Sequence, residues 1–387
     1  MVAGTLGLQS RVMASQTPVP LLDLKPQLAT IRAEVDEALR RVVDSQLLIL
    51  GSEVAELEKE LAAYVGAKHA IGCASGTDAL VLSLHALSVG GGDEIVTTPF
   101  SFFASASCAA LLGATPVFVD IEPGTFNIDV ARIEDAVTPK TKAVIPVHLF
   151  GQCADMDPIL AMGARREIPV IEDACQAIGA TYSGRGAGSM GATGAFSFFP
   201  SKNLGAFGDG GMVTTNDDAL AAKLRMLRVH GERERYKHAE IGWNSRLDAL
   251  QAAILRVKLP RLDAWTAGRV ANADRYDRLF VESGLVAGER VTLPVRAPGG
   301  RHIFNQYTIR VKRRDALSEH LKSRGIGWGI YYPIPLHLQE CFEHLGYEPG
   351  DFPEAERASH EVLSLPIFPE LTPAQIERVV SEIASFG

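Results

Sequence analysis

Apolar residues recur at helical spacing in the first part of the chain. One set shares a helix face and consists of Ile31, Val35, Ala38, Leu39 and Val42. A second set consists of Val54, Leu57, Leu61 and Val65, and Ser52 stands just before it. Because side chains three and four positions apart meet on one side of a helix, these patterns predict two helices, the second capped by Ser52.

Short apolar runs follow, separated by helix-like stretches such as Asp78–Leu87 and Pro158–Glu167. Six of these runs are predicted as buried strands: Ile95–Thr97, Pro116–Asp120, Ala143–His148, Val170–Asp173, Ala195–Phe199 and Met212–Thr215. Strands that alternate with helices are typical of a layered α/β fold. We therefore expect an α/β/α arrangement around a mostly parallel sheet.

The pattern changes in the last third of the chain. A long amphipathic segment at 246–280, interrupted at Pro260, is expected to connect two domains. Beyond it, Gln306–Val311 alternates like a strand and Asp315–Arg324 has helical spacing. Thr372–Gln375 combines an N-cap, a proline at the first helical position and a capping-box glutamine. These elements predict a smaller C-terminal α+β domain.

A chain of 387 residues is long enough for two domains. We predict a large domain at 18–265 and a small domain at 266–387, after an N-terminal extension at 1–17 that is expected to be mobile. The extension has no basic start followed by an apolar core, so it does not resemble a secretory signal. No uninterrupted apolar run approaches about 18–20 residues, so we expect no membrane span and a cytoplasmic protein.

Composition excludes several other classes of protein. Hydrophobic residues make up 47% and charged residues 22%, which excludes a disordered chain. The formal net charge of −8, without a dense basic patch, argues against nucleic acid as the main partner. The five cysteines are odd in number and contain no C-x-x-C pair, so we expect reduced thiols, with neither a disulfide framework nor a metal site.

Two glycine-rich motifs at 186–191 do not fit their context. Gly186-x-Gly188-x-x-Gly191 matches a dinucleotide-binding fingerprint, but that motif must follow a strand and open a helix. Ala187-Gly-Ser-Met-Gly191 is close to a nucleophile elbow and fails the same requirement. Both lead into a strand-like run, so we predict a flexible loop here.

Three other segments carry candidate chemistry, and the first is Ala74-Ser75-Gly76-Thr77-Asp78. It places a small turn with hydroxyl groups before an apolar helix. Free backbone N–H groups and the positive end of the helix dipole suit such a turn to bind phosphate. Taken alone, the segment favours a simple capped helix, with Ser75 or Thr77 as the N-cap.

The second segment is an apolar run that ends in Glu172 and Asp173, with Gln176 shortly after. Ligands of open α/β sheets gather at the carboxyl ends of strands. A carboxylate there can accept a hydrogen bond from a protonated ring nitrogen and stabilise its charge. A helix cap or a solvated pair of acids is an equal alternative.

The third segment places Lys202 just after an apolar run, between Pro200 and a glycine-rich stretch at 208–211. A lysine removed from water loses proton affinity and becomes an amine nucleophile that can form a Schiff base. The alternative is an ordinary surface lysine, which the apolar and glycine-rich flanks disfavour. A phosphate site, a carboxylate and a reactive lysine are together what pyridoxal 5'-phosphate requires.

At these residues the sequence resembles the DegT/DnrJ/EryC1/StrS family of sugar aminotransferases. The resemblance runs from Pro20 to the last helix. The matching motifs are Gly76-Thr77-Asp78-Ala79-Leu80, Glu172-Asp173-Ala174-x-Gln176, Phe196-Ser197-Phe-x-Pro200-x-Lys202-x-Leu204, Gly242-x-Asn244-x-Arg246 and Pro335-Leu336-His337. The resemblance implies a fold-type-I PLP-dependent transferase, similar to aspartate aminotransferase.

The resemblance also implies roles for individual residues. It implies catalysis by Lys202, as the Schiff-base lysine, and by Asp173, as the partner of the ring nitrogen. Cofactor contacts are implied for Gly76, Thr77, Phe102, Asp173, Gln176, Ser197, Lys202 and Asn244. Among these, Phe102 is implied to stack on the cofactor ring, and Phe100 and Phe103 are the alternatives for this role. Asn244 reaches the cofactor of a neighbouring subunit, so a homodimer with shared active sites is expected. Substrate contacts are implied for Arg246, Tyr332 and His337, with a helical side-chain pair or a satisfied loop histidine as alternatives.

The implied activity is transfer of an amino group from L-glutamate to a nucleotide-linked keto-sugar. Lys202 stands where some family members have a histidine and act as dehydratases, which favours transamination. The nucleotide can be UDP, dTDP or GDP, and the stretch 235–251 favours amination at C3 over C4. Alternatives are another fold-type-I enzyme, such as a desulfurase using Cys341 or an aldolase, and a cofactor-bound regulatory protein.

Overall fold

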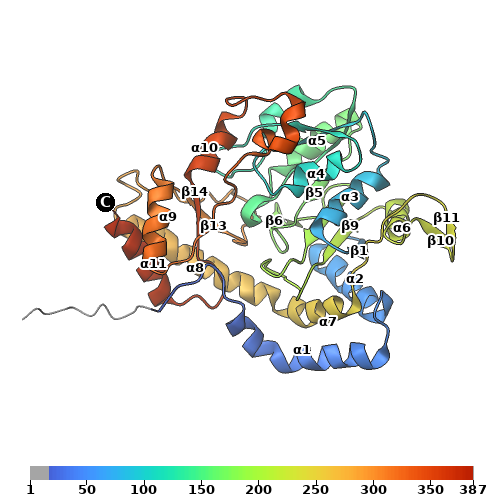
Figure 1. Cartoon of the computed structure of the whole chain (residues 1–387), viewed down its shortest axis with the longest axis horizontal. Coiled ribbons are helices and arrows are strands. Elements are labelled where there is room, and N and C mark those ends of the chain that lie inside the picture. Colours follow the sequence, from blue (N-terminus) through green and yellow to red (C-terminus); the bar gives the residue numbers. More distant parts are fainter. Residues whose placement is uncertain (1–16, 387) are drawn as a thin grey trace, which may run out of the picture.

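The computed structural model describes residues 17–386, so nearly all of the predicted extension at 1–17 lies outside the described residues (Figure 1). The helices are α1 (Lys25–Ser45), α2 (Gly51–Val65), α3 (Gly76–Ala86), α4 (Ala104–Ala110), α5 (Met156–Arg166), α6 (Asp218–Leu227), α7 (Ala249–Lys258), α8 (Leu262–Glu282), α9 (Arg314–Ser323), α10 (Pro353–Glu361) and α11 (Pro373–Ser385). The strands are β1 (His69–Cys73), β2 (Glu94–Thr97), β3 (Thr115–Phe118), β4 (Thr141–Val144), β5 (Ile171–Asp173), β6 (Thr181–Tyr182), β7 (Arg185–Gly186), β8 (Thr193–Ser197), β9 (Gly211–Thr215), β10 (Glu232–Glu234), β11 (Lys237–His238), β12 (Gly300–Arg301), β13 (Tyr307–Arg310) and β14 (Val362–Leu365).

Seven strands form the central sheet. One set has the order β1-β9-β8-β5 and the other has the order β3-β2-β4. Isolated parallel bridges from Val144 to Val170 and from Val147 to Asp173 join the two sets side by side. Only β9 runs against its neighbours, pairing antiparallel with both β1 and β8. The prediction of a mostly parallel α/β sheet is therefore confirmed.

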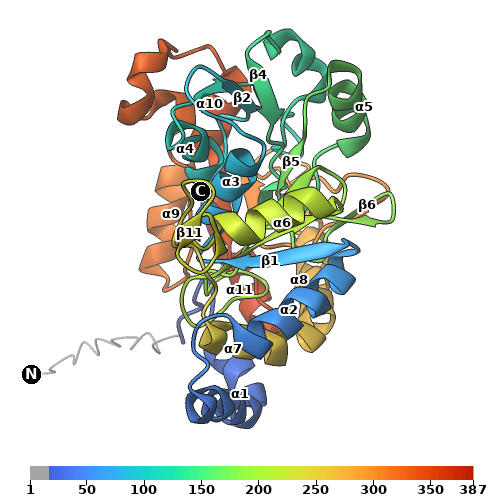
Figure 2. The same ribbon diagram turned by 90° about the vertical axis from the view of Figure 1, so that its right-hand side faces the viewer.

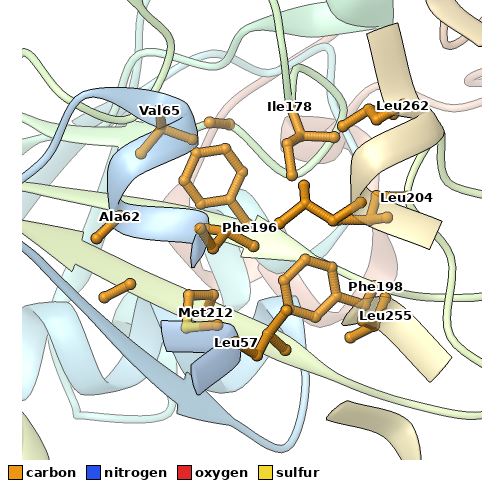
Figure 3. Close-up of a cluster of buried hydrophobic side chains, with 14 of the residues drawn as sticks. Leu57, Ala62, Val65, Ile178, Phe196, Phe198, Leu204, Met212, Leu255 and Leu262 are labelled. Carbon is orange, nitrogen blue, oxygen red and sulfur yellow. The ribbon is translucent and has the colours of Figure 1, made fainter. Parts of the chain in front are cut away.

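Alternate residues of the central strands point to opposite faces of the sheet, as the pleat requires. Ala70, Phe196 and Met212 belong to a cluster with apolar residues of α2 and α7 (Figure 3). Their chain neighbours Ile71, Ala195 and Val213 belong to a second cluster, with residues of α3, α4 and α6. Figure 2 shows α2 and α6 on opposite sides of β1. Helices thus cover both faces.

A further core lies in the C-terminal part of the chain. It combines apolar residues of α8, α9, α11, β13 and β14 with Val19. Helix α8 links the cores, since Leu262 belongs to the sheet cluster and Ala273 to the C-terminal one (Figure 1). The predicted domain boundary, between residues 265 and 266, lies within α8. We propose that the two domains meet in this helix. Residues 336–362 pack mainly on the large part, against Phe100, Phe118 and Phe126.

Two predicted caps have different outcomes. Thr372 and Gln375 form the complete capping box of α11, as predicted. The prediction for Ser52 is wrong, because α2 begins at Gly51 and its N-cap is Leu50, without a side-chain hydrogen bond. Gly51 has a φ of 82°, a left-handed conformation that favours glycine, and the observed N-cap lies two residues before the predicted one.

Candidate active site

A cavity of about 720 Å³ opens at the carboxyl ends of β1, β5 and β8. Ligands of open α/β sheets bind at this edge, and the volume suits a small-molecule site. Most of the predicted site residues line the cavity, namely Gly76, Thr77, Phe102, Asp173, Gln176, Ser197, Lys202 and Tyr332. Residues 306 and 331–339 supply a further wall from the C-terminal part of the chain.

The start of α3 forms one end of the cavity. Ser75 is the N-cap, and its hydroxyl accepts a hydrogen bond from the Asp78 N–H at 3.1 Å, so the capped-helix interpretation is correct. The N–H groups of Gly76 and Thr77 have no partner within residues 17–386. A Cβ on Gly76 would lie 2.7 Å from the Ser197 Cβ, so only glycine allows this close packing against β8. The capped turn therefore also presents free donors to an anion.

Asp173 lies at the end of β5 and is buried. Its Oδ2 accepts a hydrogen bond from the Ser105 hydroxyl at 2.7 Å, and its Oδ1 accepts one from the Cys175 N–H at 3.2 Å. Both oxygens retain further lone pairs, which leaves capacity for a donor in the cavity. The carboxylate is therefore held in place and can accept a hydrogen bond from a ligand.

The adjacent acid, Glu172, points away from the cavity into a buried network. Its carboxylate accepts hydrogen bonds from the N–H groups of Gly188, Met190 and Gly191, at 2.8, 2.6 and 2.7 Å. His148 Nδ1 accepts the Ala154 N–H, so Nε2 carries the ring proton and donates it to Glu172 at 2.9 Å. The glycine-rich segment is a loop, as predicted, but it is fixed by Glu172 rather than flexible.

Lys202 lies in the turn that follows β8, with its amine facing the cavity. Burial lowers the pKa of Lys202, although the nearby Cys175 and Asp173 partly oppose this effect. The amine has no hydrogen-bond or ion-pair partner among residues 17–386. A lysine with a lowered pKa and no direct ion pair is a competent nucleophile once deprotonated.

Aromatic side chains form another wall of the cavity. Phe100 is fully buried in the core, whereas Phe102 keeps 56% of its surface exposed and lines the cavity together with Phe103. Phe102 therefore meets the steric requirement for stacking on a ring, and Phe100 does not. Gln176 accepts the Phe150 N–H at 2.8 Å and donates to the Tyr332 hydroxyl at 2.9 Å.

Three predicted residues do not reach this cavity in the single chain. Asn244 is exposed and pairs with Val229, and Arg246 is half-buried without an ion-pair partner in the described part of the chain. His337 is buried beside the cavity wall and lies 3.1 Å from Glu356 and 4.7 Å, ring to ring, from Phe352. Burial lowers the pKa of His337. Its Nε2 has a partner in Glu356, but its Nδ1 is buried without a hydrogen-bond partner among the described residues, so the alternative of a satisfied loop histidine is met at one ring nitrogen only.

Several lining residues were not predicted from the sequence. They are Ser101, Cys175, Asp209, Gln306, Tyr331, Ile334 and Gln339. Cys175 and Asp209 lie within motifs already identified, so their position in the chain was a usable signal. Gln306 and Ile334 come from the C-terminal part and reach the cavity only through the tertiary fold. Within residues 17–386, no group of three or more His, Cys, Asp or Glu side chains could hold a metal ion.

These residues fit pyridoxal 5'-phosphate. The unpaired N–H groups of Gly76 and Thr77, with the Ser197 hydroxyl, supply donors for a phosphate. Asp173 supplies an acceptor for a protonated ring nitrogen, and Lys202 supplies an unpaired amine for the aldehyde. All five cysteines are free thiols. No helix among the described residues is long and apolar enough to cross a membrane.

Comparison with known proteins supports the same assignment. The profile of the DegT/DnrJ/EryC1/StrS aminotransferase family matches residues 29–384. The chain is 53% identical to a protein of Geobacillus stearothermophilus named pleiotropic regulatory protein, over 95% of this chain and 98% of that one. It is 46% identical to the UDP-N-acetyl-3-dehydro-alpha-D-glucosamine 3-aminotransferase of Acidithiobacillus ferrooxidans, over 96% of this chain and 98% of that one.

A further relative and a solved structure both come from Streptomyces venezuelae. The dTDP-3-amino-3,4,6-trideoxy-alpha-D-glucose transaminase of Streptomyces venezuelae is 44% identical, over 96% of this chain and 97% of that one. The crystal structure of S. venezuelae DesV, solved with a ketimine intermediate, superposes with a TM-score of 0.91 at 44% identity, covering 95% of this chain and 98% of that chain. The fold-type-I architecture is thus shared along nearly the whole chain.

Proposed function

The chain belongs to the DegT/DnrJ/EryC1/StrS aminotransferase family, and we propose that it moves the amino group of L-glutamate to C3 of a keto-sugar carried on a nucleoside diphosphate. It is a PLP-dependent sugar aminotransferase. The observation that carries the proposal is the unpaired amine of Lys202 in the same cavity as the Asp173 carboxylate and the free N–H groups of α3.

Each of these groups has a role in the proposed reaction. When bound, the cofactor supplies an aldehyde for the amines and an electron-withdrawing ring. Gly76, Thr77 and Ser197 would hold its phosphate, Phe102 and Gln176 would flank its ring, and Asp173 would keep the ring nitrogen protonated. Lys202 Nζ removes the α-proton of L-glutamate and later delivers a proton to the sugar carbon that receives the amine. Overall, L-glutamate becomes 2-oxoglutarate and the ketone becomes an amine.

The choice of C3 rests on similarity to named relatives. Two of them, at 46% and 44% identity, are named for amino transfer at position 3, one on a UDP-sugar and one on a dTDP-sugar. Both alignments span at least 96% of this chain, so the similarity is not confined to the cofactor-binding motifs. Because these two relatives differ in nucleotide, the proposal specifies the sugar carbon that is aminated and does not specify the nucleotide base.

We also propose that the active unit is a homodimer in which Asn244 and Arg246 complete the site of a second copy. Both residues lie outside the cavity of their own chain, and Arg246 has no anion within the described residues. Exposed apolar side chains lie near this segment: the Leu48 carbonyl accepts a hydrogen bond from the Ala249 N–H, and Ile49 pairs with Asp248. An exposed apolar patch beside unpaired site residues suits contact with a second copy.

The five free thiols support a reducing compartment such as the cytoplasm.

The alternatives carry less support. Cys341 is exposed in a short helical turn at 340–345 and does not line the cavity, so it lacks the position that a desulfurase nucleophile needs. A regulatory role is suggested by the names of two relatives, the Geobacillus protein and a sensory transduction protein of Saccharopolyspora erythraea. One assay distinguishes an enzyme from a regulator that binds the cofactor without turnover.

That assay incubates the holoprotein with L-glutamate and a panel of UDP-, dTDP- and GDP-linked 3-keto- and 4-keto-sugars, with product detection by mass spectrometry. We expect one 3-keto-sugar to gain an amino group, together with an equal amount of 2-oxoglutarate. The Lys202→Ala variant serves as the inactive control. Amination of only 4-keto-sugars would overturn the C3 assignment, and turnover of no sugar in the panel would favour a regulatory protein.

A further inference from the structure

A chain of two buried hydroxyl groups leads to Asp173. Ser105 lies in the first turn of α4, is fully buried, and its Oγ is 2.7 Å from Asp173 Oδ2. Ser101 is 2% exposed, and its Oγ is 2.8 Å from the Ser105 Oγ. Asp173 and Ser105 are 68 positions apart in the chain, so only the fold brings these groups together.

Counting protons fixes the direction of both hydrogen bonds. An ionised carboxylate can only accept, so Ser105 uses its single hydroxyl proton to donate to Asp173. The Ser105 oxygen can then only accept in its contact with Ser101, and therefore Ser101 is the donor. Each donation polarises the next, because hydrogen bonds in a chain strengthen one another in a low-dielectric interior. These two hydrogen bonds thus hold the partially positive hydroxyl hydrogen of Ser105 against one oxygen of Asp173.

We propose that Ser105, supported by Ser101, is a positioning residue that keeps Asp173 ionised and correctly oriented. This inference rests on the proposed function, in which Asp173 must hold a proton on the ring nitrogen of the cofactor. A hydrogen bond to the charged form of a carboxylate favours that form. Without it, the proton shared between the carboxylate and the ring nitrogen moves towards the carboxylate, and the ring loses its positive charge.

The geometry leaves Ser105 no other role in the site. It is not among the residues that line the cavity, so it cannot contact either substrate directly. The second oxygen of Asp173 already accepts the Cys175 N–H at 3.2 Å, so loss of Ser105 leaves the carboxylate tethered at one oxygen only. Removal of the hydroxyl is therefore expected to lower kcat while KM for both substrates stays the same.

The experiment compares Ser105→Ala with Ser83→Ala, after reconstitution of each with pyridoxal 5'-phosphate labelled with 15N in the ring. Ser83 is a matched control because it is also fully buried in a helix, but its hydroxyl donates to the Ala79 carbonyl of its own helix. For Ser105→Ala we expect the 15N resonance to move towards the neutral pyridine position and kcat to fall by about ten- to hundred-fold. For Ser83→Ala we expect the wild-type resonance and rate.

A second variant keeps the inference testable if Ser105→Ala does not fold. Ser101→Ala removes the donor to Ser105, and we expect a smaller shift of the 15N resonance in the same direction. Wild-type resonances in every Ser101 and Ser105 variant that folds would overturn the inference. If the wild-type protein itself binds the labelled cofactor but transfers no amino group, the proposed function fails instead, and the two failures are distinguishable.

Discussion

At the scale of single residues, two adjacent carboxylates have separate tasks. Glu172 and Asp173 alternate across the sheet, so their side chains must point to opposite faces. Glu172 binds His148 and three backbone N–H groups of the loop at 188–191, whereas Asp173 faces the cavity. The first residue therefore stabilises the fold, and the second serves the proposed reaction.

Replacing each acid with its amide tests this division. Glu172→Gln places an NH₂ group against backbone donors and breaks a buried network, so we expect a loss of about 3–5 kcal/mol in the free energy of unfolding. Asp173→Asn keeps the shape but removes the charge, so we expect nearly unchanged stability and a fall in kcat of about a hundred-fold or more. Urea unfolding and steady-state kinetics measure both effects. The division is wrong if Asp173→Asn retains the wild-type rate.

Site residues can be predicted from the sequence when a single local motif indicates their chemistry. Lys202, Asp173 and Gly76 lie in short segments whose apolar runs, turns and glycines predict the local structure, and all three line the cavity. Ser105 is not predictable in this way, because its contact with Asp173 depends on the packing of α4 against β5. His337 also shows the limit, since a motif fixes its place in the chain but not the direction of its side chain.

At the scale of elements, the segment 199–208 that carries Lys202 is held from several sides. Asn203 donates to the Ile303 carbonyl at 3.1 Å, and Gln251 of α7 accepts the Phe207 N–H at 2.8 Å. Lys258, at the end of α7, donates to the Gly205 carbonyl. Helix α7 therefore fixes the segment that places the Lys202 amine.

The Lys258 contact gives a prediction about pH. Burial lowers the pKa of Lys258 from 10.5 to about 8, and its amine lies 5.7 and 6.0 Å from the ring centroids of Phe207 and Trp265. Between these two pH values the unfolded chain binds a proton that the folded protein has released, so stability rises with pH in this window.

Urea unfolding of the wild type and of Lys258→Met, at matched protein concentration, measures this effect. We expect the stability of the wild type relative to Lys258→Met to increase by about 3 kcal/mol from pH 7.5 to 10.5. Groups other than Lys258 titrate in both proteins and cancel in the difference. Parallel pH curves for the two proteins would contradict the assignment.

The elements themselves were largely predictable, with instructive exceptions. The six predicted strands all correspond to observed strands, and the break at Pro260 separates α7 from α8. Strand β1 was missed, because a histidine and a glycine interrupt its five-residue apolar run. Burial on both faces stabilises this strand, and that contribution is tertiary rather than local.

At the scale of the whole molecule, the cavity depends on both parts of the chain. Residues before α8 supply Lys202 and Asp173, and residues after it supply the wall at 331–339. Asn244 and Arg246 lie outside the cavity of their own chain, and we propose that a second copy completes the site. No sequence pattern within one chain shows where a second copy sits, so the family resemblance alone suggested this part of the site.

Mixing two inactive variants tests whether sites are shared. Lys202→Ala and Asn244→Ala are each expected to be nearly inactive. In a hybrid dimer with shared sites, one site carries both defects and the other carries none. An equal mixture after subunit exchange is therefore expected to recover about a quarter of the wild-type activity. Absence of recovery, despite exchange proven by native mass spectrometry, would refute the shared site.

The central claim is that the amine of Lys202 bonds the aldehyde of pyridoxal 5'-phosphate. The most direct test is reduction of the holoprotein with borohydride, followed by proteolysis and peptide mass spectrometry. We expect a single modified residue, Lys202, carrying the mass of the reduced cofactor, and no such modification in Lys202→Ala. A cofactor found on another lysine, or on none while the wild type is active, would contradict the account.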